Sequence, residues 1–384
     1  MDKMANGFKA LVRAPIKGCH ILKTEDIFEK MILPATMMIE ADSSQGLIQA
    51  IGYLKYNLSQ EHYDVVMRGQ RKLYGNLKPS LFRNAHSLAE YNNAEKKFKE
   101  RLLEAQTEFK KIASISCMKK ADGSLIPMQG NMYDFIDVKK TYFPPLLQHY
   151  GINTPWLDVV DNIWVALWFS CWECEKRFSI PEVNNVYPDE LNREVARFSM
   201  YHERRVECGQ FTFSSEIEKM NKEIHHYEKE KIHLLIKEGI PEGERLNKIK
   251  KIQEKIFQKT KEIDRLQKIS SFCYIILLKV PQDSQNNQDK KIQVVDLRKC
   301  IPSYYLRPHA QHALVIRKPP EKEQDFTSNI AGIIRIKLEN ALQWLGMGQT
   351  LSVKNLFPSP CCDYGLRKLL GLKTFNQEIE IPTP

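Results

Sequence analysis

Residues 215–269 constrain the fold more than any other part of the sequence, because their apolar side chains recur at helical spacing over many turns. Two heptad tracks are present, namely Ile217, Met220, Ile224, Tyr227 and Leu234, then Ile249, Ile252, Ile256, Ile263 and Leu266. Glycine and proline interrupt the tracks at residues 239–243. The pattern predicts an antiparallel helical hairpin with nearly balanced charges, as on a solvated coiled-coil face. Dimerisation, docking of a partner and a purely decorative insertion all remain open as its role.

Strand-like segments on both sides of this hairpin predict the rest of the fold. One lies at residues 63–67, before the hairpin, and the others follow it, at residues 272–280, 292–297, 313–316 and 333–336. Helical patterns separate them, and no regular alternation of strand and helix is present. We therefore expect an α+β fold with a mixed or mostly antiparallel sheet flanked by helices. Residues 1–40 are expected to form an irregular lead-in, and residues 41–384 one domain with residues 215–269 inserted.

Charge and composition limit the expected partners and compartment. The net charge of +10 favours anionic partners such as nucleic acid, nucleotide phosphates or an acidic surface, without choosing among them. Nine cysteines without regular spacing are typical of a reducing compartment, and we expect no metal site. Neither a secretory signal nor an apolar run long enough for a bilayer is seen. These features predict a cytoplasmic protein without a membrane partner.

Several short motifs follow one another along the chain. They are Met67-Arg68-Gly69-Gln70, Leu77-Lys78-Pro79-Ser80-Leu81-Phe82-Arg83, Leu146-Leu147-Gln148-His149-Tyr150-Gly151 with Thr154, Leu157-Asp158, Asn162 and Ala166-Leu167-Trp168-Phe169, Arg307 with Gln311, and Leu356-Phe357-Pro358 with Asp363. In this order they resemble a known family, the FRG domain. The resemblance extends over residues 43–372 and departs from the family pattern at Met67 and Val160. It implies a bacterial accessory protein, an effector in stress or anti-phage defence. No P-loop, dinucleotide fingerprint, nucleophile elbow or zincin motif is present.

The arginines of these motifs are the candidate anion-binding groups. Arg68 follows a short strand and precedes Gly69, so that a guanidinium and a closely approaching backbone could meet a phosphate; the alternative is a structural pair with Asp158. Arg83 either converges on the same anion or is an ordinary surface arginine. Arg307 precedes a strand and either reaches a ligand or lies in a solvated loop.

The central motif supplies the candidate polar groups. His149 suits proton transfer, or satisfies buried polar groups, and the adjacent Tyr150 is better placed in the core. Asp158 either accepts a ribose hydroxyl and orients Arg68, or caps the local backbone. The amides of Gln70 and Gln148 either read the edge of a base or hold their own loops.

The order of these groups along the chain is similar to the three-part NAD site of ADP-ribosyltransferases. In that resemblance Arg68 holds the dinucleotide, NAD is the substrate, and a late carboxylate stabilises the ribosyl cation. Gln311 stands where the carboxylate is expected, so we predict catalytic roles for His149, Asp158 and Gln311, with Asp158 as one possible source of the charge. The alternative is a module without catalysis that binds nucleic acid or a phosphorylated ligand, with the hairpin for dimerisation or partner docking.

Overall fold

The computed structural model describes residues 17–22, 37–115, 117–119, 125–127, 141–150, 152–174, 206–208, 214–236, 241–282, 292–319, 323–346, 351–358, 362–363 and 365–366. Most of the expected lead-in at residues 1–40, part of the turn at residues 239–243 and Gly151 lie outside these residues. Among the described helices, none combines the length and the apolar character needed to cross a bilayer.

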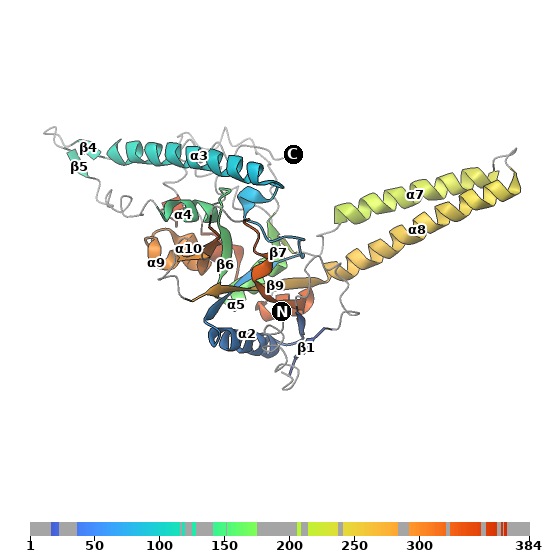
Figure 1. Cartoon of the computed structure of the whole chain (residues 1–384), viewed down its shortest axis with the longest axis horizontal. Helices are drawn as coiled ribbons and strands as arrows, with labels where there is room; N and C mark the ends of the chain where they lie inside the picture. Colours follow the sequence, from blue (N-terminus) through green and yellow to red (C-terminus); the bar gives the residue numbers. More distant parts are fainter. Residues whose placement is uncertain are drawn as a thin grey trace.

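An open mixed sheet forms the centre of the molecule (Figure 1). In spatial order its strands are β1 (Cys19–Ile21), β2 (Met38–Ala41), β12 (Ile330–Lys337), β9 (Phe272–Pro281), β3 (Tyr63–Gln70), β6 (Leu157–Val160), β11 (Ala313–Arg317) and β10 (Gln293–Asp296). Neighbouring strands are antiparallel except β2 and β12, which are parallel. The α+β fold with a mixed sheet is therefore confirmed, and each of the strand-like segments contributes a strand.

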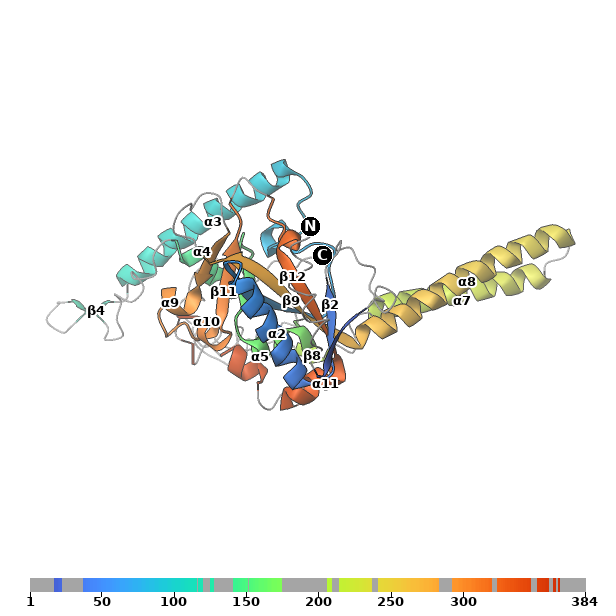
Figure 2. The same cartoon turned by 60° about the horizontal axis from the view of Figure 1, so that its bottom comes forward.

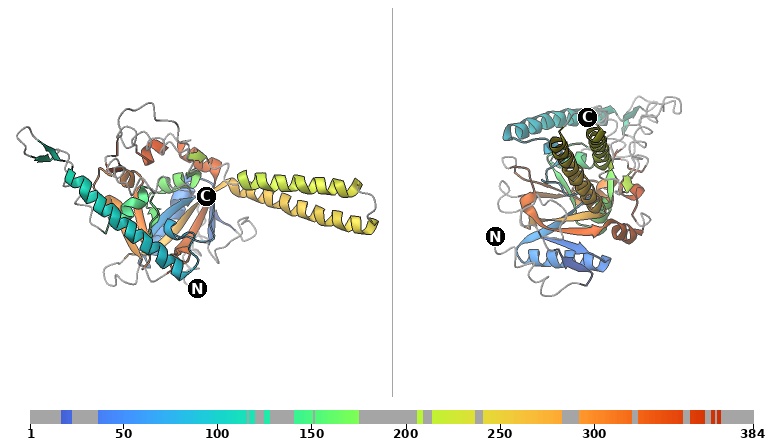
Figure 3. Two further views of the ribbon diagram at one scale, coloured as in Figure 1. Left: turned by 90° about the horizontal axis from the view of Figure 1, so that it is seen from above. Right: turned by 90° about the vertical axis from the view of Figure 1, so that its right-hand side faces the viewer.

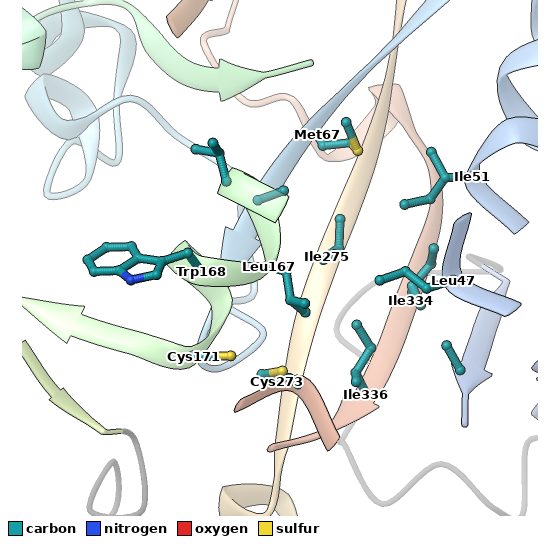
Figure 4. Packing of buried hydrophobic residues seen from close by; sticks show 14 of the residues in the cluster. Leu47, Ile51, Met67, Leu167, Trp168, Cys171, Cys273, Ile275, Ile334 and Ile336 are labelled. Carbon is teal, nitrogen blue, oxygen red and sulfur yellow. The ribbon is translucent and has the colours of Figure 1, made fainter. Parts of the chain in front are cut away.

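Strand β9 explains why the sheet has a core on each face. Almost every residue of this strand is buried, with Cys273, Ile275 and Leu277 on one face and Tyr274, Ile276 and Leu278 on the other. Successive side chains of a strand point to opposite faces, so an unbroken apolar run suits a central strand that is covered on both sides. Figure 4 shows the first face, where Ile275 packs beside Met67, Leu167 and Ile334.

Helices cover the face that carries Met67 and Ile275. Three of these helices are α2 (Ser44–Ser59), α5 (Ile163–Cys171) and α11 (Leu338–Trp344) (Figure 2). The shorter helices lie toward the β10 edge of the sheet, namely α4 (Phe143–His149), α9 (Leu297–Cys300), α10 (Leu306–Ala310) and α12 (Val353–Leu356). Ser43 begins α2, since its Oγ accepts a hydrogen bond from the backbone N–H of Gly46. Asn162 caps α5 in the same way through the N–H groups of Trp164 and Val165.

The helical hairpin predicted at residues 215–269 is confirmed. Helices α7 (Ser214–Ile236) and α8 (Glu242–Ser270) run antiparallel and project from the body, and α8 leads directly into β9 (Figure 3). Ile249, Ile252, Ile263 and Leu266 are buried in their seam. A further long helix, α3 (Leu88–Ile115), lies along the top of the body in the view of Figure 1 and points away from the hairpin.

Short elements complete the described chain. The 3-10 helices η2 (Ser80–Phe82) and η6 (Thr327–Asn329) follow loops beside the sheet. Two small antiparallel ribbons are formed by β4 (Cys117–Lys119) with β5 (Leu125–Pro127), and by β7 (Trp172–Cys174) with β8 (Val206–Cys208). Helix η2 positions the site described below, because it follows the loop that leaves β3.

Candidate functional site

The central sheet opens between β3 and β6, and the candidate site begins there. These strands are paired at one position, Met67 with Val160, whereas β3 pairs with β9 along its whole length. Beyond that position the Nη1 of Arg68 donates a hydrogen bond of 2.6 Å to the backbone oxygen of Asp158. The guanidinium thus satisfies a strand carbonyl that would otherwise need a partner in β3.

The guanidinium of Arg68 is not fully satisfied by the described part of the protein. Its side chain is half-buried, and its buried Nε has no hydrogen-bond partner among the described residues. Burial lowers the pKa of the Arg68 guanidinium, the charge of Asp158 opposes this shift, and the positive charge of Arg83 adds to it. An anion beside Arg68 would offset both the cost of burying its positive charge and the repulsion by Arg83. Arg83 itself is exposed at the end of η2.

Gly69 makes a close approach, but to the protein rather than to a ligand. A β-carbon at this position would lie 2.0 Å from the backbone oxygen of Ala166 and 2.6 Å from the backbone nitrogen of Ser170. Both atoms belong to α5, so glycine is required for this helix to pack against β3. This packing explains the glycine without a ligand, and the approach of the Gly69 backbone to a phosphate stays a prediction. The neighbouring Gln70 is buried, and its Oε1 has no partner among the described residues.

The carboxylate of Asp158 is held from two sides by the end of α4. Gln148 donates from Nε2 to Oδ2 of Asp158 at 2.8 Å, while its own Oε1 accepts from Thr154 at 2.6 Å and from Ser80 at 3.4 Å. Nε2 of His149 lies 3.3 Å from the other oxygen, Oδ1. The Asp158 side chain remains 35% exposed, so a ligand can reach this positioned negative charge.

Gln311 determines which nitrogen of His149 carries the proton. Its Nε2 donates to the backbone oxygen of Leu356 at 2.8 Å, which turns Oε1 toward Nδ1 of His149 at 3.2 Å. An amide oxygen only accepts, so Nδ1 of His149 must donate. The unprotonated Nε2 of the neutral ring then faces the carboxylate of Asp158.

The contact between Nε2 of His149 and Oδ1 of Asp158 consequently lacks a proton. Burial lowers the pKa of His149, although Asp158 and the hydrogen bond with Gln311 favour the charged ring. Oδ1 of Asp158 and Nε2 of His149 are both buried, and neither makes a well-formed hydrogen bond within the described part of the chain. One added proton satisfies both atoms, so the pair is suited to accept a proton from a bound ligand.

Arg307 and Tyr150 lie next to His149, and both side chains make contacts with other protein groups. The Nη1 of Arg307 donates to the backbone oxygen of His149 at 2.8 Å, and its guanidinium stacks between the rings of Tyr150 and Phe357, at 4.8 and 5.2 Å. Tyr150 donates to the buried Asp363 at 2.7 Å, and burial raises its pKa well above the usual value. Both residues were candidates for ligand binding, and Tyr150 was also interpreted as a core residue. Their described contacts hold His149 and the closing segment, which includes Phe357 and Asp363, together.

Half of the expected site residues meet in one cluster. Arg68, Gln148, His149, Asp158 and Gln311 form one connected polar cluster, with Arg83 near its edge. Sequence reasoning missed Ser80 and Thr154, which fix the amide of Gln148. Their positions in the sequence could have indicated this role, because Ser80 follows Pro79 and Thr154 follows Asn153, and both belong to the motifs described above.

Comparison with known families and structures identifies one part of the chain. Residues 63–178 match the family model of the FRG domain, a span that includes β3, α4, β6 and α5. The span thus contains Arg68, Gln148, His149 and Asp158, whereas Arg307 and Gln311 follow it. No curated protein and no solved structure matches the chain significantly. The opening strand and the central polar motif both lie within this match, so residues 63–178 are the part of the chain that is similar to the FRG domain.

Proposed function

We propose that this FRG domain binds NAD and transfers its ADP-ribosyl group, with Asp158 as the carboxylate that stabilises the reacting sugar. The observation that carries the proposal is the Asp158 carboxylate, which is partly exposed, held by Gln148 and His149, and adjacent to the guanidinium of Arg68. An oriented negative charge beside a phosphate-binding arginine suits a substrate that develops positive charge next to its phosphates.

In the proposed reaction the bond between C1′ of the ribose and the nicotinamide nitrogen breaks. Nicotinamide leaves as a neutral molecule with the bonding electron pair, and C1′ becomes positively charged. A hydroxyl group of water or of an acceptor molecule then adds to C1′ and loses its proton to the pair formed by His149 and Asp158. Gln311 is a positioning residue here, because its amide oxygen contacts Nδ1 of His149 and its amide nitrogen is held by the backbone of Leu356.

The test uses NAD labelled in the nicotinamide ring, incubated with the full chain and two variants. The wild-type protein should release labelled nicotinamide. Asp158→Asn should retain NAD binding, because the amide is isosteric, but should lose turnover by ~10²–10³-fold, as when one preorganised charge-stabilising group is removed. Arg68→Ala should instead lose NAD affinity. Absence of both binding and turnover in the wild-type protein would overturn the proposal.

The second candidate is a module that binds nucleic acid or a phosphorylated ligand without catalysis. The net charge of +10 and the pair of Arg68 and Arg83 favour it. It requires affinity that falls steeply with salt, and no product. Asp158→Asn separates the candidates, since removal of the negative charge should strengthen anion binding in both cases but abolish turnover only in the first. Binding of either ligand that is independent of salt would count against this module.

For the cellular role we propose a bacterial effector in stress or anti-phage defence. The support is the FRG domain itself, together with a site that would consume or transfer part of an essential nucleotide. Expression of the wild-type chain should reduce phage plaque numbers, and Asp158→Asn at equal abundance should restore them. Equal plaque numbers for wild type, Asp158→Asn and empty vector would remove this role.

A further inference from the structure

Thr154 is a fully buried polar residue in the segment before β6, and its hydroxyl group contacts the amide of Gln148. Oγ1 of Thr154 accepts a hydrogen bond from the backbone N–H of Trp156 at 3.2 Å and donates to Oε1 of Gln148 at 2.6 Å. Ser80 repeats this arrangement, since its Oγ accepts from the backbone N–H of Thr154 at 3.3 Å and donates to the same Oε1 at 3.4 Å. Each hydroxyl group therefore relays the polarity of one backbone N–H group to the amide.

These contacts fix the orientation of the Gln148 amide. Its oxygen receives two hydroxyl hydrogens, which uses both of its lone pairs, and its Nε2 donates to Oδ2 of Asp158 at 2.8 Å. The reverse orientation would place the amide oxygen against the carboxylate and would remove the acceptor of both hydroxyl groups. An amide oxygen occupied in this way is not available to the edge of a base, so the contacts support the role of Gln148 in holding its own segment.

The two carboxylate oxygens of Asp158 consequently differ. Oδ2 receives the N–H of Gln148, whereas Oδ1 is buried without a hydrogen-bond partner among the described residues and lies 3.3 Å from Nε2 of His149. The arginines in contact with these two residues are Arg68 from β3 and Arg307 from α10. They donate to the backbone oxygens of Asp158 and His149, at 2.6 and 2.8 Å. The missing hydrogen thus belongs at Oδ1 and not at Oδ2.

We propose that Thr154 is a positioning residue that, through Gln148, directs the proton bound at the site to Oδ1 of Asp158. In Thr154→Val the amide loses its shortest hydrogen bond and can turn its oxygen toward Oδ2 of the carboxylate. A proton then binds between these two oxygens, and His149 loses the charged partner that favours its own protonation. The placement of the proton does not depend on the substrate, whereas its effect on turnover rests on the proposed function.

Titration of the histidine rings by nuclear magnetic resonance, on the full chain with isotope-labelled histidine, tests this placement. The signal of His149 is the one that is lost in His149→Gln. Thr154→Val should lower the pKa measured for His149, because a protonated Asp158 no longer favours the charged ring. Thr154→Ser keeps the hydroxyl group and should titrate as the wild type does. Thr260→Val is the matched control, since Thr260 is exposed on α8.

A second set of variants separates this route from a loss of packing. Gln148→Leu should lower the pKa of His149 by itself, because Oδ2 of Asp158 then lacks its N–H donor. Thr154→Val added to Gln148→Leu should cause no further change, since the hydroxyl group acts through the amide. An unchanged pKa of His149 in Thr154→Val, or a further fall in the double variant, overturns the proposal.

Turnover of NAD by the same preparations distinguishes the failure of this proposal from that of the proposed function. Thr154→Val should lower kcat by ~10²-fold with KM unchanged, as when a reacting group is displaced by about 1 Å, and Thr154→Ser should restore it. A wild-type chain that does not turn NAD over, with a lowered pKa of His149 in Thr154→Val, supports the placement of the proton and removes the proposed function. A wild-type chain that turns NAD over, with the same pKa of His149 in Thr154→Val, leaves the proposed function and overturns the role of Thr154.

Discussion

At the residue scale, the groups that face the two ring nitrogens of His149 determine its protonation. Gln311 presents an amide oxygen to Nδ1, and Asp158 presents a carboxylate oxygen to Nε2. Its two neighbours favour the protonated ring, but burial is the larger effect and keeps the pKa lower than usual. A buried neutral histidine next to a partly exposed carboxylate is a candidate proton acceptor.

This arrangement predicts how stability depends on pH. The pKa of His149 is lower in the folded chain than in the unfolded chain, so the unfolded chain binds the proton more readily as pH falls. Stability from this group should therefore be present above about pH 6.5 and should be lost progressively below it. His149→Gln should flatten the dependence of the unfolding free energy on pH below about pH 6.5, measured in urea titrations. A slope unchanged from the wild type would contradict this assignment.

Gly69 permits the closest approach of β3 to α5, and its substitution tests that contact. Gly69→Ala should lower the free energy of unfolding by roughly 3 kcal/mol, because the obstructing atoms are helix backbone and cannot move singly. Gly52→Ala on α2 should have the opposite sign, a gain of up to about 1 kcal/mol, since a β-carbon there has no described neighbour within 4 Å. Chemical unfolding measures both. Equal effects would refute the packing role of Gly69.

At the scale of secondary elements, the hairpin is the part least connected to the site. Helices α7 and α8 bury one seam, but several large apolar residues remain exposed near the ends that lie farthest from the body. These are Ile232, Leu235, Ile236 and Leu246. A two-helix unit with a single seam leaves apolar surface that a second hairpin can cover.

We therefore expect residues 215–269 to mediate self-association. Replacing them with a short glycine-rich linker from α7 to β9 should lower the mass in light scattering to that of one chain. Ile232→Glu with Ile236→Glu should do the same with the hairpin still present, whereas Lys222→Glu, on an exposed polar position, should not. An unchanged mass after deletion would exclude this role for the hairpin.

Across the whole molecule, the closing segment ties the site together. Leu356 orients Gln311 through its backbone oxygen, Phe357 stacks on Arg307, and Asp363 accepts hydrogen bonds from Tyr150 and from the backbone of Arg307. These contacts join residues that are far apart along the chain. The site therefore depends on a segment outside the span that matches the FRG family model.

Asp363 is the point at which to test this dependence. Asp363→Ala should lower the free energy of unfolding by about 2–4 kcal/mol, because it leaves the buried donors of Tyr150, Arg307 and Leu366 without their acceptor. Ligand binding should weaken as His149 loses its support. Asp264→Ala, at an exposed position of α8, should change neither quantity. A folded Asp363→Ala protein with wild-type stability would show that the closing segment is not needed.

The sequence by itself determined the local elements of this protein. Heptad spacing predicted the hairpin, β-rich runs predicted the strands, and ordered motifs indicated the family, because each pattern depends on residues that are near one another in the chain. Arg68, His149 and Asp158 were recognised as candidates for the same reason, by their places within motifs.

Only the tertiary structure decided what those residues contact. The gap between β3 and β6, the turn of Gln311 toward His149 and the approach of α5 to Gly69 all arise from pairing of segments distant in sequence. Tyr150 and Arg307 became internal supports because a later segment packs over them. Burial and orientation depend on the partner that packing supplies, and a motif does not contain that partner.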